Sequence, residues 1–153
     1  MSNEMKDWMR DRDEEERLNN EFCKLHPWAL ARDWRGEPIY GSNMMDNFMP
    51  GWRKAFEDSF VKEMDIAYNA LPDNEKEDFY FLQVKEKYGR LTIYPTYYSS
   101  EIDAVLSKYE DLSTRTCCNC GVPTEFHTKG WVLPLCQKCA DKRGLKVESG
   151  ISL

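Results

Sequence analysis

Apolar residues recur at intervals of three and four positions in two segments of the chain, and this spacing predicts two amphipathic helices. The first is expected over residues 52–71, after Pro50 and before Pro72, which are typical residues at helix boundaries. The second is expected over residues 101–114, because the stretch from Ser100 to Asp103 has the spacing of a capping box. The stripe of the first helix is largely apolar and consists of Trp52, Phe56, Ser59, Phe60, Glu63, Met64, Ala67 and Leu71, and that of the second consists of Ile102, Val105, Leu106, Tyr109 and Leu112. Two such stripes can form the core of one domain.

Between these helices the hydrophobic period changes from that of a helix to that of a strand. Residues 79–85 alternate between apolar and polar, and residues 91–94 return after a turn at residues 88–90, so we predict an antiparallel β-hairpin. The side chains expected on one face of its first strand are Tyr80, Leu82 and Val84. The basic residues expected at its tip are Lys85, Lys87 and Arg90. A charged tip is usually solvated, but it is also a candidate contact for an anion.

The N-terminal segment is dominated by charged residues, most densely over residues 11–17. Leu18, Phe22 and Leu25 have helical spacing, so a helix is expected over residues 12–25 with a frayed start. A second short apolar patch precedes it, formed by Met5, Trp8 and Met9. The alternative interpretation is that this segment is an exposed helix that binds a partner.

Residues 28–51 contain many glycine and proline residues, so regular structure there is expected to be short or absent. The segment is nevertheless rich in aromatic residues and methionines, which suit adaptable binding surfaces. The candidate partner-binding residues are Trp34, Tyr40, Met44, Met45, Phe48 and Met49. The alternative is that these side chains simply cover the core helix, and the sequence leaves both interpretations open.

Four cysteines in two Cys-x-x-Cys pairs have the spacing of a zinc site. The pairs are Cys117 with Cys120 and Cys136 with Cys139, and fifteen residues separate them. Each pair places two thiolates on one tight turn, and two turns supply a tetrahedron of sulfur. We therefore predict one structural Zn²⁺, because four cysteines leave no open position for a catalytic water. Redox dithiols and an iron–sulfur cluster are the alternatives.

The surroundings of these pairs predict a zinc ribbon. Residues 124–127 and 131–135 are expected to be short strands joined by a turn, and Gly121 suits the positive φ that follows a metal knuckle. His127 is interpreted as a half-exposed strand residue rather than as a ligand. The two remaining cysteines, Cys23 and Cys118, are interpreted as packing residues.

Composition and charge narrow the range of functions. The chain is 41% hydrophobic and 31% charged, which is typical of a globular domain, and it has neither a membrane-spanning run nor a signal-peptide core. We therefore expect a cytoplasmic protein with no membrane contact. Its net charge of −6 divides into −2 for residues 1–35, −7 for residues 36–114 and +3 for residues 115–153. Four thiolates with Zn²⁺ add about −2 to the last value, so no large phosphate-binding face is indicated.

One stretch of the chain resembles a known family. The sequence from Gln83 to Tyr94 is similar to the "QVKEKFGGLRFY" hairpin of small bacterial and phage-encoded proteins, in which a helix and a Cys-x-x-Cys-Gly knuckle follow. Upstream, residues 26–30 and the pair Gly51-Trp52 are similar to further segments of that family, so the resemblance spans residues 20–140. This chain departs from it at Arg90, where the family has a second glycine, and at Met49-Pro50, where it often has cysteine. The family is uncharacterised, so the resemblance implies a bacterial or phage origin and no reaction.

The sequence lacks the motifs of the common enzyme classes, such as a glycine-rich phosphate loop, Gly-x-Ser-x-Gly or His-Glu-x-x-His. The fold predicted is α+β: residues 1–114 form a body of helices packed on a hairpin, and residues 115–145 form a zinc ribbon docked on that body. The function predicted is that of a non-catalytic, zinc-stabilised module that binds another protein, for which a basic protein fits the acidic body. If the chain is phage-encoded, the partner is a host defence or transcription protein that it inhibits or modulates.

Two other hypotheses remain open. The first is a nucleic-acid-binding accessory protein that uses the ribbon and the basic hairpin tip. The second is a small metal-dependent hydrolase built on carboxylates around the core helix, and the carboxylates considered are Asp46, Asp58, Glu63 and Asp65.

Overall fold

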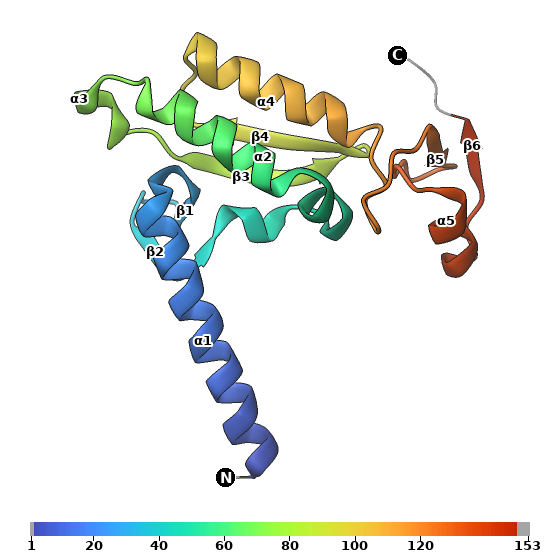
Figure 1. Ribbon diagram of the computed structural model, residues 1–153, viewed down its shortest axis with the longest axis horizontal. Coiled ribbons are helices and arrows are strands. Elements are labelled where there is room, and N and C mark those ends of the chain that lie inside the picture. Colours follow the sequence, from blue (N-terminus) through green and yellow to red (C-terminus); the bar gives the residue numbers. More distant parts are fainter. Residues whose placement is uncertain (1, 150–153) are drawn as a thin grey trace.

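Five α-helices and three two-stranded antiparallel sheets make up residues 2–149, the part of the chain that this computed structural model describes (Figure 1). The helices are α1 (Asn3–Leu25), α2 (Pro50–Asn69), α3 (Asp73–Lys76), α4 (Ser100–Ser113) and α5 (Gln137–Arg143). The paired strands are β1 (Leu30–Arg32) with β2 (Pro38–Asn43), β3 (Phe81–Lys87) with β4 (Arg90–Pro95), and β5 (Phe126–Thr128) with β6 (Val147–Ser149). Two short 3₁₀ helices, η1 (Pro27–Ala29) and η2 (Met44–Asn47), flank the first sheet. The predicted α+β class is confirmed.

The core lies between the β3–β4 hairpin and the helices α2 and α4, which lie next to each other (Figure 1). The apolar residues of the stripe predicted for α2 are buried along its whole length. Phe60 is at its centre and meets the rings of Trp28 and Tyr109 edge-on, with centroid distances of 5.8 and 5.3 Å. Each such side chain contributes about 1.5–3 kcal/mol through burial, so this aromatic cluster is a main source of the fold's stability.

Helix α4 covers the outer edge of the hairpin. Its N-cap is Ser99, whose Oγ accepts a hydrogen bond from the Ile102 amide at 3.1 Å, one residue earlier than the capping box predicted. Near its other end the Ser113 hydroxyl accepts a hydrogen bond from the Leu91 amide at 2.8 Å. One turn earlier in α4, the Glu110 carboxylate accepts a hydrogen bond from the Ile93 amide of β4. An edge strand whose amides are satisfied in this way is protected from pairing with another chain.

The face predicted for the first hairpin strand is wrong. Leu82 is 56% exposed, whereas Phe81 and Val84 are buried. The register between β3 and β4 shifts between Phe81 and Gln83, so the strict alternation of sides is interrupted at that point. A bulge adds one residue to one strand, and every side chain beyond it then changes face relative to a simple period of two.

Residues 28–51 form a layer beneath the core rather than a long open loop. They contain the small β1–β2 sheet and η2, and η2 lies against β3. Met44, Met45 and Phe48 are buried, so these three candidate partner-binding residues belong to the core, because η2 turns them toward α2 and the hairpin. Met49 is partly buried against the same core. Only two of the six candidates are exposed on the surface: Trp34, at 91%, and Tyr40, at 75%.

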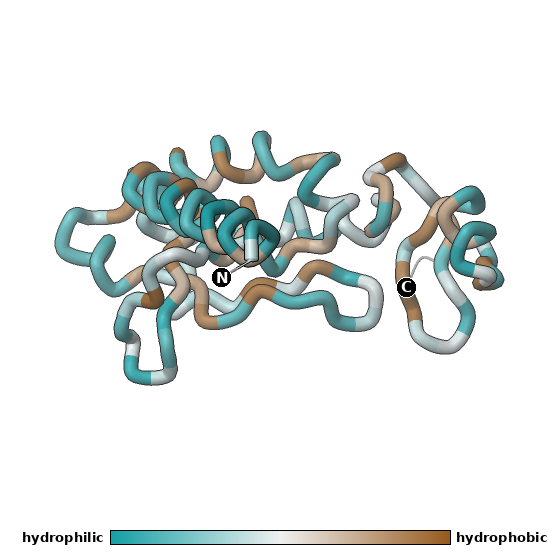
Figure 2. Tube along the Cα trace, turned by 90° about the horizontal axis from the view of Figure 1, so that it is seen from below, coloured by the Kyte–Doolittle hydropathy of each residue, from teal (hydrophilic) through white to brown (hydrophobic). Residues whose placement is uncertain are grey.

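Helix α1 is longer than predicted and begins at Asn3, capped by the Ser2 hydroxyl. Its first half projects away from the body (Figure 1), and residues 2–15 are all exposed. Ion pairs between residues three and four apart run along it, which explains why this charged segment is helical. Figure 2 shows that most of α1 is hydrophilic. Within residues 2–149, no helix combines the length and the apolar composition that a bilayer crossing requires.

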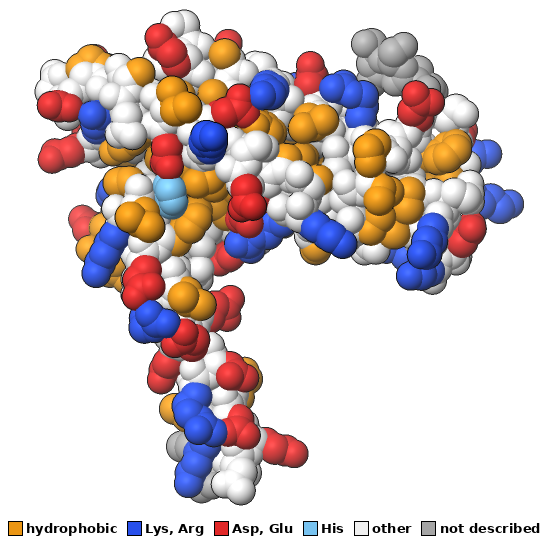
Figure 3. Space-filling view, in the orientation of Figure 1, with side chains coloured by type: hydrophobic (Ala, Val, Ile, Leu, Met, Phe, Trp, Pro, Cys, Tyr) orange, Lys and Arg blue, Asp and Glu red, His pale blue; other side chains and the backbone are white. Residues whose placement is uncertain are grey.

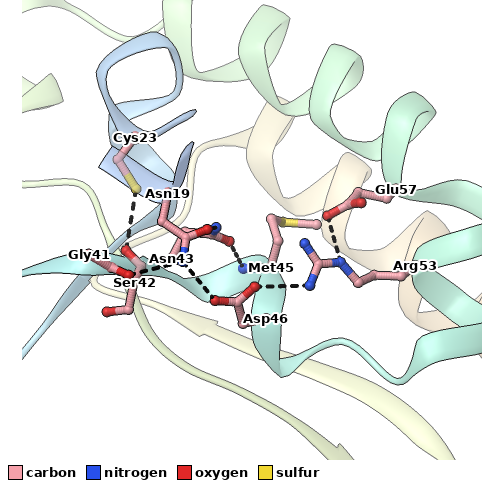
Figure 4. Close-up of polar contacts among 9 residues, drawn as sticks. All are labelled: Asn19, Cys23, Gly41, Ser42, Asn43, Met45, Asp46, Arg53 and Glu57. Carbon is pink, nitrogen blue, oxygen red and sulfur yellow. Dashed lines mark hydrogen bonds and ion pairs between the residues drawn. The ribbon is translucent and has the colours of Figure 1, made fainter. Parts of the chain in front are cut away.

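Polar contacts attach the second half of α1 to β2 (Figure 4). The Asn19 side chain donates to the Gly41 carbonyl at 3.0 Å, and the Gly41 amide donates to the Asn20 side chain at 2.6 Å. The buried Asn43 side chain donates to Asn19 at 2.7 Å and also accepts from the Met45 amide. Asn43 therefore joins α1, β2 and η2 at a single point.

Candidate metal centre

Four cysteine side chains converge at the C-terminal end of the molecule. The Sγ atoms of Cys117, Cys120, Cys136 and Cys139 all lie within 4.8 Å of one another, and those of Cys120 and Cys136 are 3.7 Å apart. In a tetrahedral zinc–thiolate site with Zn–S bonds of about 2.3 Å, the sulfur atoms are about 3.8 Å apart. The four ligands predicted from the sequence therefore meet at the spacing that a metal ion requires, and all four are free thiols.

Two local structures place these sulfurs. The first pair lies on a turn closed by a hydrogen bond from the Gly121 amide to the Cys117 carbonyl at 2.9 Å, and Gly121 has the predicted positive φ of 86°. The second pair begins α5: Cys136 is the N-cap, and its Sγ accepts from the Cys139 amide at 3.4 Å. This short helix was not predicted, because seven residues are too few for a helical period to be recognised.

Hydrogen bonds around the cluster favour negative charge on some of its sulfurs. Burial alone would raise the pKa of Cys117, but the backbone N–H groups of Cys120, Cys136 and Asn119 outweigh it and lower that pKa. Burial raises the pKa of Cys136. Four adjacent sulfurs cannot all become thiolates without a cation between them, and a metal ion supplies that charge.

A second layer of side chains, which sequence reasoning missed, orients one of the ligands. The Asn119 side-chain amide donates to the Cys139 sulfur at 3.3 Å, and Arg143 in turn donates to the Asn119 oxygen at 2.8 Å. Partners of this kind fix the position of a metal ligand. The position of Asn119 between the two cysteines of the first pair is the only sequence feature that could have indicated its role. Arg143 could not be recognised in this way, because it comes from the end of α5.

The predicted pairing of residues 124–127 with residues 131–135 is present in part, and a third segment joins it. Backbone hydrogen bonds, such as that from the Thr128 amide to the Leu133 carbonyl at 2.9 Å, link β5 to residues 133–135 on either side of a bridge between His127 and Pro134. β5 also pairs with β6 at residues 147–149, a strand that was not predicted. His127 lies on β5, as expected, and its Nε2 is 3.3 Å from a Glu148 carboxylate oxygen. It is therefore engaged outside the sulfur cluster.

Residues 115–149, called here the metal-binding region, share their core with the body. The Gly51 amide at the start of α2 donates to the Cys118 carbonyl at 2.8 Å, and the Trp52 indole donates to the Thr116 carbonyl at 3.1 Å. A Cβ atom on Gly51 would lie 2.1 Å from the Cys117 carbonyl oxygen, so no larger residue fits there. The first knuckle thus lies directly on the N-terminus of α2.

The other two cysteines lie apart from the cluster. Cys118 is fully buried, and burial, together with the neighbouring Cys117, raises its pKa to about 11. Cys23 is buried between α1 and β2, where its Sγ donates to the Ser42 carbonyl at 3.6 Å. Burial and the charge of Asp46 raise the pKa of Cys23 to about 11 as well. Both thiols are therefore protonated near neutral pH and serve as packing groups.

The carboxylates of the hydrolase hypothesis do not gather into one site. Asp46 pairs with Arg53 at 2.9 Å, and Glu63 pairs with Lys108 at 2.7 Å. Asp65 accepts from the Trp28 indole and lies 2.8 Å from a His26 ring nitrogen. Asp58 is exposed. In the part of the chain that the structure describes, the cysteine cluster is the one group of three or more His, Cys, Asp or Glu side chains arranged to hold a metal ion.

No family model, no curated protein and no solved structure matches this chain. The resemblance of the hairpin and knuckle to a bacterial and phage family therefore stays a prediction.

Proposed function

We propose that this chain is a non-catalytic module that one structural zinc ion stabilises and that binds another protein. The observation that carries the metal assignment is the convergence of four cysteine sulfurs at the spacing of a tetrahedron. An all-thiolate, four-coordinate site is typical of structural zinc, whereas catalytic zinc keeps one position for water. Tetrahedral sulfur also suits iron, so the identity of the metal needs a measurement.

The metal assignment is tested on protein purified without added metal. We expect one zinc per chain by elemental analysis and a colourless solution. Replacing a ligand, as in Cys120→Ala, should abolish zinc retention, whereas the matched change Cys118→Ala should keep it because Cys118 lies outside the cluster. Iron in place of zinc, or equal retention by both variants, would contradict the proposal.

The projecting half of α1 supports a protein partner. Met5, Trp8 and Met9 have the spacing of one helix face, and all three are exposed, Trp8 at 59%. Asn19 and Cys23, which contact β2, lie on the same face of α1, because steps of three and four residues connect them to Met9. The body thus covers only one half of the face, and a groove on a partner can cover the other half.

The charge around this face favours a basic partner. Residues 3–17 carry seven acidic and four basic side chains, and Figure 3 shows them densely arranged along the projecting helix. All three arginines of this stretch are already paired with carboxylates of the same helix. Apolar residues bordered by surplus acidic groups complement an apolar groove bordered by Lys or Arg, and opposite charges speed the encounter.

A cross-linking experiment tests this surface. A photo-reactive amino acid is placed at position 8 and, as the matched control, at the exposed position 62 of α2. In the native host we expect a cross-linked protein from position 8 and none from position 62, and we expect Trp8→Ala to reduce capture of that protein roughly tenfold. Identical products from both positions, or capture that Trp8→Ala leaves unchanged, would remove α1 as the interface.

The exposed residues of the β1–β2 sheet extend this surface. Tyr40 is next to Gly41, which contacts α1 at Glu16, and Trp34 lies in the turn between the two strands. We include Trp34 and Tyr40 in the proposed interface and leave out the three buried candidates and Met49, which is partly buried against the core. The expectation that the partner is a host defence or transcription protein comes only from the family resemblance and stays a prediction.

A further inference from the structure

We propose that the tip of the β3–β4 hairpin and the adjoining turn of the metal-binding region form a stacking surface for the bases of single-stranded nucleic acid, with Tyr88 and Trp131 as the two stacking side chains. This surface lies at the opposite end of the body from α1, and it goes beyond the protein partner proposed above.

Two aromatic side chains are presented to solvent at this junction. Tyr88 is 81% exposed at the hairpin tip, and Trp131 is 76% exposed in the turn after β5. Figures 1 and 2 both show the hairpin tip directed at the metal-binding region, and the tip contacts that region at Val132, the neighbour of Trp131. Tyr88 and Trp131 are therefore the sequence neighbours of the two residues, Gly89 and Val132, that meet at this contact. Base–aromatic stacking needs such open ring faces and tolerates any base sequence.

The turn at the tip of the β3–β4 hairpin and the turn after β5 are in close contact and are joined by hydrogen bonds. A Cβ atom on Gly89 would lie 3.0 Å from the Val132 carbonyl oxygen, so the hairpin backbone rests directly on this turn. The two oxygens of Glu86 join the two sides: one accepts from the Trp131 indole at 3.4 Å and the other from the Gly89 amide at 3.2 Å. These contacts orient the Trp131 ring and fix the turn that carries Tyr88, and a surface ordered before binding loses less entropy when a ligand arrives.

The backbone at Tyr88 is strained in a way that its packing does not explain. Its φ is 52°, and it is the one non-glycine residue among residues 2–149 with a positive φ. A two-residue hairpin turn of this kind favours Asn-Gly, because an aromatic residue is strained in the left-handed region. Since the ring is mostly exposed, burial does not repay this strain. Strain of this kind clusters at functional sites, and presenting the ring to a ligand accounts for it here.

The charge at this end suits an anionic chain. Lys87 is next to Tyr88, Lys129 precedes the Trp131 turn, and the Lys129 amide donates to the Lys146 carbonyl at 3.4 Å. None of these three lysines forms an ion pair within residues 2–149. Among the nearby carboxylates, Asp111 is paired with Arg90 at 2.9 Å, and the two oxygens of Glu86 are directed at the Trp131 indole and the Gly89 amide. Figure 3 shows Lys and Arg side chains around hydrophobic ones at this end of the molecule.

These features favour a single strand over a duplex. Two open rings with a few lysines offer stacking faces and a small number of phosphate contacts, which is the combination that binds unpaired nucleotides. A duplex hides its base faces, so its binding would depend on a wide basic surface, and the net charge of −6 provides none.

Binding of a fluorescein-labelled oligothymidylate of about 12 nucleotides to the full, zinc-loaded chain tests the proposal. At low salt we expect a saturable rise in fluorescence anisotropy. Trp131→Ala should weaken binding roughly tenfold. The control is Tyr98→Ala, which removes an aromatic side chain 54% exposed between β4 and α4, outside both proposed surfaces, and should leave the affinity unchanged. Zinc content and the circular dichroism spectrum, measured for each variant, show that it is folded.

Two further variants separate stacking from structure. Tyr88→Asn keeps a turn that tolerates positive φ, so we expect an equal or higher melting temperature together with binding weakened roughly tenfold. Lys87→Ala should lower the slope of log Kd against log salt by about 0.7, whereas Lys24→Ala on α1 should not. The absence of saturable binding at low salt would overturn the proposal. So would equal affinities for wild type, Trp131→Ala and Tyr88→Asn, or a protein that cross-links to position 131 and displaces the oligonucleotide.

Discussion

The metal-binding region and the projecting half of α1 extend from opposite ends of the same body, but they are attached by different kinds of contact (Figure 1). The metal-binding region shares buried residues with the body, and its first knuckle is in backbone contact with α2 at Gly51. Helix α1 meets β2 through the side chains of Asn19, Asn20 and Cys23, and its Phe22 packs against the core, whereas residues 2–15 are all exposed.

This difference predicts different behaviour for the two ends. Close apolar packing makes neighbouring segments unfold together, whereas a segment with few buried contacts opens on its own at low free energy. The metal-binding region should therefore unfold with the body, while the first half of α1 should fray independently. The following predictions test that contrast, from the largest expected effect to the smallest.

Removal of the metal should have the largest effect. Apparent zinc-binding free energies of about 10–16 kcal/mol are available to small metal-stabilised folds, and this energy is folding energy. We expect a strong chelator to disorder residues 115–149 and also to lower the melting temperature of the body, because Cys117 and Cys139 are part of the common core. Hydrogen exchange measured by segment would show both effects. A body with unchanged exchange and melting temperature would mean that the two regions are independent domains.

The change Gly51→Ala should disrupt the contact between the start of α2 and the first knuckle. The added Cβ would meet backbone atoms of Cys117 and Cys118 that cannot move aside without displacing the knuckle. We expect a loss of about 3 kcal/mol or more in the free energy of unfolding, measured by urea denaturation.

The matched control is Gly130→Ala. A Cβ at Gly130 meets nothing within 4 Å, and only its φ of 81° opposes the change, so we expect a loss of about 1 kcal/mol. If both variants lose the same amount, the close approach at Gly51 does not hold the two regions together.

The attachment of α1 should depend on Asn43. This buried side chain bonds to Asn19 and to the Met45 amide, so Asn43→Ala leaves groups without partners and should cost about 1–3 kcal/mol. Hydrogen exchange should become faster in the second half of α1 before it does so in α2. The exposed Asn47 is the control, and Asn47→Ala should change neither quantity. Faster exchange in α2 first would show that Asn43 supports the core rather than the helix.

The smallest effect is expected for the projecting half of α1. Trp8 is mostly exposed and has no contact with the body, so Trp8→Ala should change the free energy of unfolding by less than about 0.5 kcal/mol. Thermal unfolding at two protein concentrations measures this. A fall of several degrees that depends on concentration would mean that a second copy of the chain covers this helix.

Several features of this molecule were predictable because they depend on local spacing. The helices α2 and α4 repeat their apolar residues at helical intervals over several turns, and the four clustered cysteines form two pairs that each lie on one turn. The positive φ of Gly121 likewise follows from the short knuckle that precedes it. Such features involve residues close in sequence, so their pattern can be recognised without knowledge of the rest of the fold.

Other features depended on residues that are distant in the sequence. The faces of β3 changed because a bulge forms against β4, and Met44, Met45 and Phe48 became core residues because η2 turns them toward α2 and β3. β5 pairs with residues 147–149 as well as with the adjacent segment, and that more distant strand was not predicted. In each case the competing arrangements have similar local preferences, and packing selected among them.

The sequence by itself determined the class of the fold, the main helices, the hairpin and which four cysteines cluster, because periodicity and short spacings are local properties of the chain. Only the tertiary structure decided which aromatic and methionine side chains are exposed, that Gly51 meets the first knuckle, and that Tyr88 and Trp131 lie at one junction. Those outcomes depend on which of several segments, far apart in the sequence, covers a given apolar surface. The pattern of any one segment cannot show this, because the result depends on all the segments that could pack there.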